Sequence, residues 1–134
     1  AALFHCQYHE DEKQRKPLAG SLSPADIPEL EGERFACVCA RSGERHVLNR
    51  DGRLDISLEE GEWEVVTLAP LVNGVAVIGF ERLLNAGGAV GTWEPVEAGV
   101  KVTLREAGRL LFYRAGTGWE EKNVGPSGAE VSLP

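Results

Sequence analysis

The chain has 134 residues, of which 43% are apolar and 26% are charged, and its formal net charge is −7, from 14 basic and 21 acidic side chains. This length corresponds to one domain, and the apolar fraction is too high for a disordered chain. Phosphate binding needs a basic surface, and a bilayer span needs roughly 20 apolar residues in a row, so we expect neither a nucleic acid nor a membrane as a partner. Methionine is absent, so we expect the chain to be a piece of a longer protein.

Short runs rich in Val, Leu, Ile and aromatic residues alternate with the 16 glycines of the chain. Turn signals at this spacing are typical of all-β sandwiches and barrels. We therefore predict an all-β fold, an antiparallel β-sandwich with Gly-rich turns and at most short helical turns. Residues 1–30 are expected to be an entry strand and linker from an upstream barrel, and residues 31–134 the sandwich domain. The expected strands are residues 35–40, 46–48, 54–58, 63–68, 75–78, 100–105, 109–114 and 131–133.

The segments between the strands carry their own signals. Residues 49–52, Asn-Arg-Asp-Gly, predict a hairpin loop in which Gly52 takes a positive φ. Proline cannot donate to a ladder, so Pro70 is expected to end the strand before it. Ser23 followed by Pro24 predicts the capped start of a helical turn, which Pro28 keeps short.

The pattern of apolar residues predicts which strand faces are buried. Residues 75–78 are continuously apolar, as in a strand covered on both faces, whereas residues 100–105 alternate, as in a strand with one wet face. Cys37 and Cys39 are two apart and so share one face, where we expect buried, inert thiols in a reducing compartment. The expected core residues are Phe4, Phe35, Trp63, Val65, Val77, Ile78, Leu104, Leu110 and Phe112.

Metal-ligating and catalytic patterns are weak. His5, Cys6 and His9 form one metal-like cluster, but no second pair completes four ligands, so we expect neither a metal nor a cofactor. The serines lack the sequence motif of a catalytic nucleophile. The carboxylates of residues 59–64 are expected to form a solvated acidic rim and not a catalytic pair. The Gly-rich residues 85–91 lack the Lys-Ser/Thr end of a phosphate loop and predict a tight turn or bulge instead. No catalytic residue is expected in the chain.

Aromatic side chains offer a second kind of site. Trp63, Trp93, Trp119 and Tyr113 present apolar ring faces on which a sugar could stack, although aromatic residues of a sandwich more often belong to the core. Trp93 and Trp119 are the candidate sugar contacts.

Several segments share a pattern with a known family. Residues 78–79 and 87–90 read Ile-Gly and Gly-Gly-Ala-Val, residues 64–71 read Glu-Val-Val-Thr-Leu-Ala-Pro-Leu, and residues 108–113 read Gly-Arg-Leu-Leu-Phe-Tyr. With these motifs the chain resembles the C-terminal region of the raffinose synthase and alkaline α-galactosidase (seed-imbibition protein) family of glycoside hydrolases. Where that family has Gly-Ala-Gly-Trp after its Cys-Gln pair, this chain has Tyr-His-Glu-Asp at residues 8–11. Further similar segments are residues 4–7, 18–27, 124–125 and 130–131.

The resemblance implies a C-terminal β domain that follows a catalytic (β/α)-barrel. The two catalytic aspartates would lie upstream of Ala1, and the parent would cleave or transfer α-galactosyl units by a retaining mechanism. We therefore expect an accessory domain that packs on the barrel and supports its active-site loops, in a cytoplasmic enzyme. The barrel and α-galactosides are the expected partners, and hydrolase and galactosyltransferase both stay open.

Two alternatives lead to different expectations. A carbohydrate-binding module would expose Trp93 or Trp119 beside polar side chains. A protein-interaction β domain would expose an apolar patch of more than a few hundred Å².

Overall fold

A computed structural model describes residues 1–125 and 130–133 of the chain. The described part is built from strands and three short 3-10 turns, which confirms the predicted all-β fold. The strands are β1 (Ala2–Phe4), β2 (Leu18–Leu22), β3 (Arg34–Cys39), β4 (Arg45–Asn49), β5 (Leu54–Leu58), β6 (Trp63–Pro70), β7 (Val75–Gly79), β8 (Val90–Val96), β9 (Gly99–Leu104), β10 (Gly108–Arg114), β11 (Gly118–Val124) and β12 (Glu130–Leu133), and the turns are η1 (Glu12–Gln14), η2 (Pro24–Asp26) and η3 (Ala86–Ala89).

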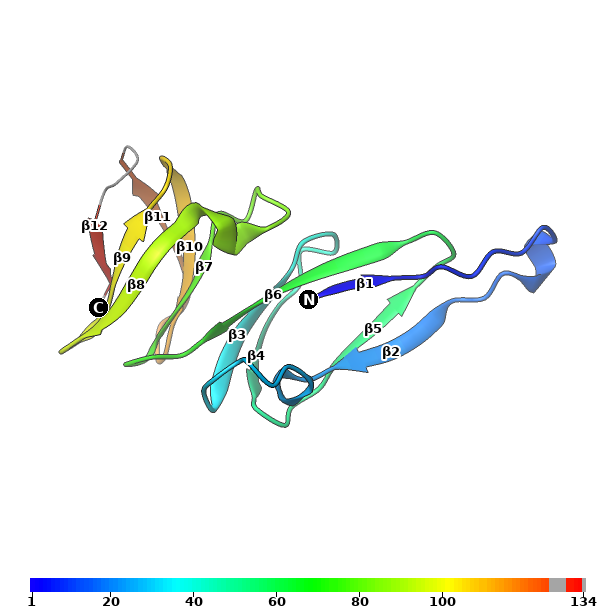
Figure 1. Ribbon diagram of the computed structural model, residues 1–134, viewed down its shortest axis with the longest axis horizontal. Coiled ribbons are helices and arrows are strands. Elements are labelled where there is room, and N and C mark those ends of the chain that lie inside the picture. Colours follow the sequence, from blue (N-terminus) through cyan, green and yellow to red (C-terminus); the bar gives the residue numbers. More distant parts are fainter. Residues whose placement is uncertain (126–129, 134) are drawn as a thin grey trace.

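The strands form four antiparallel sheets. The first sheet is β2-β5, the second is β1-β6-β3-β4, the third is β7-β10-β11 and the fourth is β8-β9-β12. Figure 1 shows the first two sheets at one end of the elongated molecule and the last two at the other. Three separate clusters of buried side chains fill the spaces between successive sheets, so the four sheets stack as four layers.

The central strands are apolar on both faces because each lies between two cores. In β3, Phe35 and Cys37 face the first sheet, and Ala36 and Val38 face the third. The same alternation in β7 and β10 sends odd and even residues into different clusters. This arrangement confirms the prediction that β7 is covered on both faces, and it places the buried Cys37 and Cys39 together.

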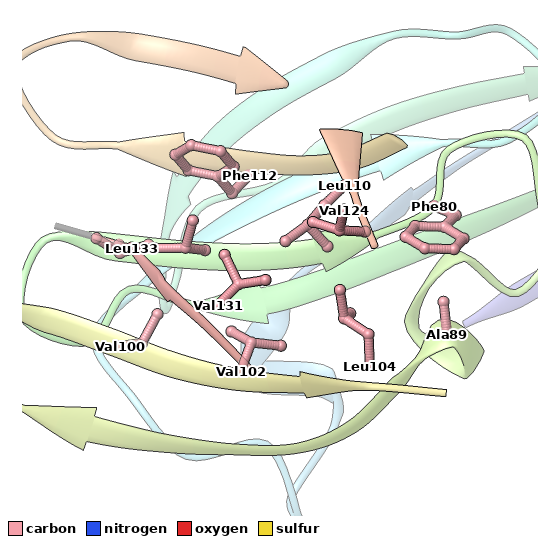
Figure 2. Close-up of a cluster of buried hydrophobic side chains, with 11 residues drawn as sticks. Phe80, Ala89, Val100, Val102, Leu104, Leu110, Phe112, Val124, Val131 and Leu133 are labelled. Carbon is pink, nitrogen blue, oxygen red and sulfur yellow. The ribbon is translucent and has the colours of Figure 1, made fainter. Parts of the chain in front are cut away.

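The largest core lies between the third and fourth sheets. Phe80, Leu110 and Phe112 meet Val102 and Leu104 there, and all five are at most 3% exposed (Figure 2). The residues of β9 that face this core are the even-numbered ones, as the alternation of the sequence predicts.

The core between the second and third sheets is built from small side chains. Alanines at four positions contribute to it, beside Ile78 and Leu111. Small residues let the two sheets approach closely, which gives this interface little tolerance for added volume. The four alanines are Ala36, Ala69, Ala76 and Ala86.

Several sequence predictions need correction. Residues 49–52 do not close a hairpin, because β4 pairs with β3 and β5 pairs with β2, and Gly52 has no positive φ. Pro70 is the last residue of β6 rather than a residue beyond it. Phe4 and Trp63 were expected in the core but are 62% and 36% exposed. Val65 and Val77 are half-buried, and the other five expected core residues are buried.

Other local predictions are confirmed. Ser23 caps η2, with its Oγ accepting from the N–H of Ala25, and Asp26 accepts from the N–H of Ser23 in return. Residues 85–91 form the η3 turn followed by a register shift between Val90 and Thr92, so both a turn and a bulge are present.

The N-terminal residues contribute strands to two sheets. β1 pairs with β6, and β2 pairs with β5. The boundary at residue 30 stays a prediction. Within the described residues, no helix has the length and apolarity to cross a membrane.

Candidate functional site

Trp93 on β8 lies beside a groove between the two ends of the molecule. Residues 29–32, residues 70–72 and Trp93 line this hollow, which we call the Trp93 groove and which has a volume of about 540 Å³. Pockets for small ligands have volumes of about 300–1,000 Å³. The indole is 45% exposed, so a ligand in the groove can reach it.

Trp93 lies against core residues and close to a hydrogen-bonded pair of turns. Trp93 also lines a small apolar hollow with Val77 and Val100, so part of the indole rests on the core. Asn73 donates from its Nδ2 to the carbonyl oxygens of Val96, at 2.7 Å, and Gly99, at 3.3 Å. These bonds hold the β8–β9 turn, which follows Trp93 in the chain, against the β6–β7 turn.

The acidic wall of the groove is also held in place. The Nη1 of Arg50 donates to the carbonyl oxygens of Leu30, at 2.6 Å, and Gly32, at 3.1 Å. Within the described residues, the carboxylates of Glu29 and Glu31 have no hydrogen bond or ion pair. The lining of the groove therefore combines two acidic residues with an aromatic one.

Trp119, the second candidate sugar contact, lies elsewhere. It packs edge-on against Tyr113, with ring centroids 5.4 Å apart, and the guanidinium of Arg45 lies 5.7 Å from its ring centroid. The structure thus does not bring Trp93 and Trp119 together. A role of either residue in sugar binding stays a prediction.

Exposed aromatic side chains gather at the other end of the second sheet. Phe4 and Trp63 are register partners in the β1–β6 pair, so their side chains share a face. Along β6, Trp63 has the parity of Ala69, which is buried against the third sheet. The third sheet does not extend over Phe4 and Trp63, and Tyr8 beyond them is 73% exposed. We call Phe4, Trp63 and Tyr8 the aromatic end.

Glu64 is the one acidic residue buried among the described residues, at 3% exposure. Its carboxylate accepts from the N–H groups of Arg41 at 2.8 Å, Ser42 at 3.1 Å and Val65 at 3.0 Å. Burial acts to raise the pKa of Glu64, but the three backbone donors and the Ser42 hydroxyl outweigh it and hold the pKa below its ordinary value. These hydrogen bonds satisfy the carboxylate of Glu64, whose role is therefore to stabilise the β3–β4 turn.

His5, Cys6 and His9 do not come together as ligands. His5 is buried with its Nε2 3.2 Å from the carbonyl oxygen of Lys16, whereas Cys6 is exposed. Among the described residues, no three His, Cys, Asp or Glu side chains are placed to hold a metal ion.

No protein-family model matches the chain. The chain is similar to a galactinol–sucrose galactosyltransferase of Oryza sativa subsp. japonica, with 30% identity over 113 residues. The match covers 72% of this chain but only 14% of the rice protein, so the chain spans a small part of the length of that relative. The similarity supports the family indicated by the motifs.

Proposed function

We propose that this chain is an accessory β domain of an enzyme that acts on α-galactosides, and that it supports a catalytic barrel contributed by another part of the same protein. The observation that carries the proposal is the similarity to a galactosyltransferase in which the matched part is only 14% of the whole. The all-β fold of the described residues agrees with a supporting role.

The aromatic end is the surface proposed to pack on the barrel. Phe4 and Trp63 continue the same face of the second sheet that the third sheet covers further along. Exposure of an apolar sheet face to water is unfavourable, and burial of that face against a partner surface is favourable. The rice protein has most of its length outside the matched region, so a protein of that kind has ample chain for a large partner domain.

A chimera tests this proposal. The matched segment of the rice galactosyltransferase is replaced by this chain, and galactosyl transfer from galactinol to sucrose is measured. We expect activity in the chimera, loss of activity when the segment is deleted, and a marked loss in a chimera carrying both Phe4→Ser and Trp63→Ser. The matched control is Leu84→Ser, which changes an exposed apolar residue outside the aromatic end. A folded but inactive chimera, or turnover of an α-galactoside by the isolated chain, would contradict the proposal.

A second candidate function is sugar binding in the Trp93 groove. One face of a pyranose ring is rich in C–H groups and stacks on an aromatic ring, while its hydroxyls donate to carboxylate oxygens. The Trp93 groove combines the 45% exposed Trp93 with the acidic residues Glu29 and Glu31. The negative charge of the two glutamates disfavours anionic ligands but is compatible with neutral sugars.

Calorimetric titration with galactinol and with sucrose tests the second candidate. We expect a dissociation constant of the order of 1 mM for at least one of them, and a loss of about tenfold or more in Trp93→Ala. Trp63→Ala is the matched control, because it removes an exposed indole outside the groove. Equal titrations of Trp93→Ala and the unaltered chain would reject the groove as a sugar site.

A further inference from the structure

One edge of β6 is only partly covered. β1 pairs with the first residues of β6, with Ala2 opposite Val65 and Phe4 opposite Trp63. In the sheet order β1-β6-β3-β4, β1 is the strand on that side of β6. Figure 1 shows β6 continuing well past the N-terminus toward the other end of the molecule. Among the described residues, therefore, no strand lies along this edge between Thr67 and Pro70.

The ladder stops with one rung open. The N–H of Ala1 donates to the carbonyl of Val66 at 2.7 Å, and the N–H of Val66 donates back to the carbonyl of Ala1 at 2.7 Å. Backbone groups of alternate residues point to the same edge of a strand, so the N–H and C=O of Leu68 point as those of Val66 do. Pro70 has no N–H, which leaves Leu68 as the complete open rung.

The open rung lies in a slot with two walls. The hollow along this edge is lined by Leu68, by Ile27 and Leu30, and by Asn85 and Gly87. Leu30 packs on the side of the core between the first and second sheets, whereas residues 85–87 belong to the side of the third sheet. A strand in this slot would place alternate side chains against the two walls.

The geometry points to an extended segment that continues β1 on the N-terminal side of Ala1 and fills this slot. On the proposed function, this segment is the polypeptide that joins the domain to the catalytic barrel. Main-chain pairing at an exposed sheet edge is a common mode of recognition, and the walls select side chains.

Two versions of the chain, each lengthened by four residues before Ala1, test this inference. The first carries Val-Thr-Val-Thr before Ala1, which places a valine opposite Leu68, on the side of Leu30. The second carries Val-Thr-Pro-Thr, in which proline removes the N–H that would donate to the carbonyl of Leu68. In the first chain we expect hydrogen exchange of the Leu68 amide to slow by about fivefold or more, and Tm to rise by about 2–5 °C. Neither change is expected in the proline control.

Two results would overturn the inference. One is equal Leu68 exchange and equal Tm in the two extended chains. The other is a dimer of the unextended chain, shown by light scattering, in which Leu68 is already protected, because the occupant would then be a second copy. These readouts report on the backbone of the isolated chain, whereas the chimera reports on catalysis, so failures of the two proposals can be told apart.

Discussion

Gly79 lies against the backbone carbonyl of Ala86 so closely that a Cβ at Gly79 would overlap it. Gly79 also has a φ of 112°, and the N–H of Phe80 donates to the carbonyl of Ala86 at 3.0 Å. This contact ties the end of β7 to the η3 turn. The Ile-Gly pair and the Gly-Gly-Ala-Val segment of the family-like motif therefore meet in space, although they are separated in the sequence.

We expect Gly79→Ala to lower the free energy of unfolding by about 2–4 kcal/mol, because the substitution adds both backbone strain and an overlap with a backbone atom. Chemical denaturation measures the loss. Gly20→Ala is the matched control, since nothing lies within 4 Å of the Cβ position of Gly20, and we expect a change of less than about 0.5 kcal/mol there. Similar losses in both variants would argue against the contact.

Glu64→Gln is expected to destabilise the chain by about 1.5–3 kcal/mol at neutral pH, since hydrogen bonds to a charged group are among the stronger ones. The folded pKa of Glu64 lies below its ordinary value, so its stabilisation is fully present above the unfolded pKa and is lost as the pH falls through the folded pKa. Denaturation curves of both chains should therefore converge at acidic pH. Glu44→Gln, at an exposed carboxylate paired with His46, should cost less than about 1 kcal/mol. A gap that persists at low pH would contradict the role of the charge.

The cysteines should differ in reactivity. Burial, with a smaller effect of Cys39, raises the pKa of Cys37 to about 12, and burial likewise raises the pKa of Cys39. The thiolate is the reactive form, so both thiols stay inert at neutral pH. Iodoacetamide treatment of the native chain, followed by mass spectrometry, should label Cys6 alone, and denaturant should expose all three. Labelling of Cys37 before unfolding would contradict the buried position of β3.

Ala36→Leu should destabilise the chain by about 1–3 kcal/mol, because Ala36 is fully buried where the second and third sheets approach through small side chains. Thermal unfolding measures the effect. Ala19→Leu, on the exposed face of β2, adds the same volume without a neighbour to displace and should be close to neutral. If the two variants behaved alike, the four-layer stack would be wrong.

Local signals in the sequence were sufficient for most strands and for the caps. The apolar runs at β3, β5, β7, β9 and β10 predicted strands in the right places, and the alternation in β9 predicted its buried face. The expected strand ranges did not include β1, β2, β8 and β11, which have few or no buried residues. Strands with little apolar patterning give a weak signal, because their pairing is decided by neighbours elsewhere in the chain. A further signal was available at Asn73-Gly74, where both residues have positive φ and turn the chain from β6 into β7.

The sequence by itself determined that the chain is all-β, where most strands lie and that Cys37 and Cys39 share a buried face, because these properties follow from composition and from a two-residue period. Only the tertiary structure decided which strands pair and which faces are covered. Residues 49–52 look like a hairpin but join different sheets, and Trp63 looks like a core residue but lies where the third sheet ends. Pairing and coverage depend on contacts between residues far apart in the chain, which no local pattern encodes.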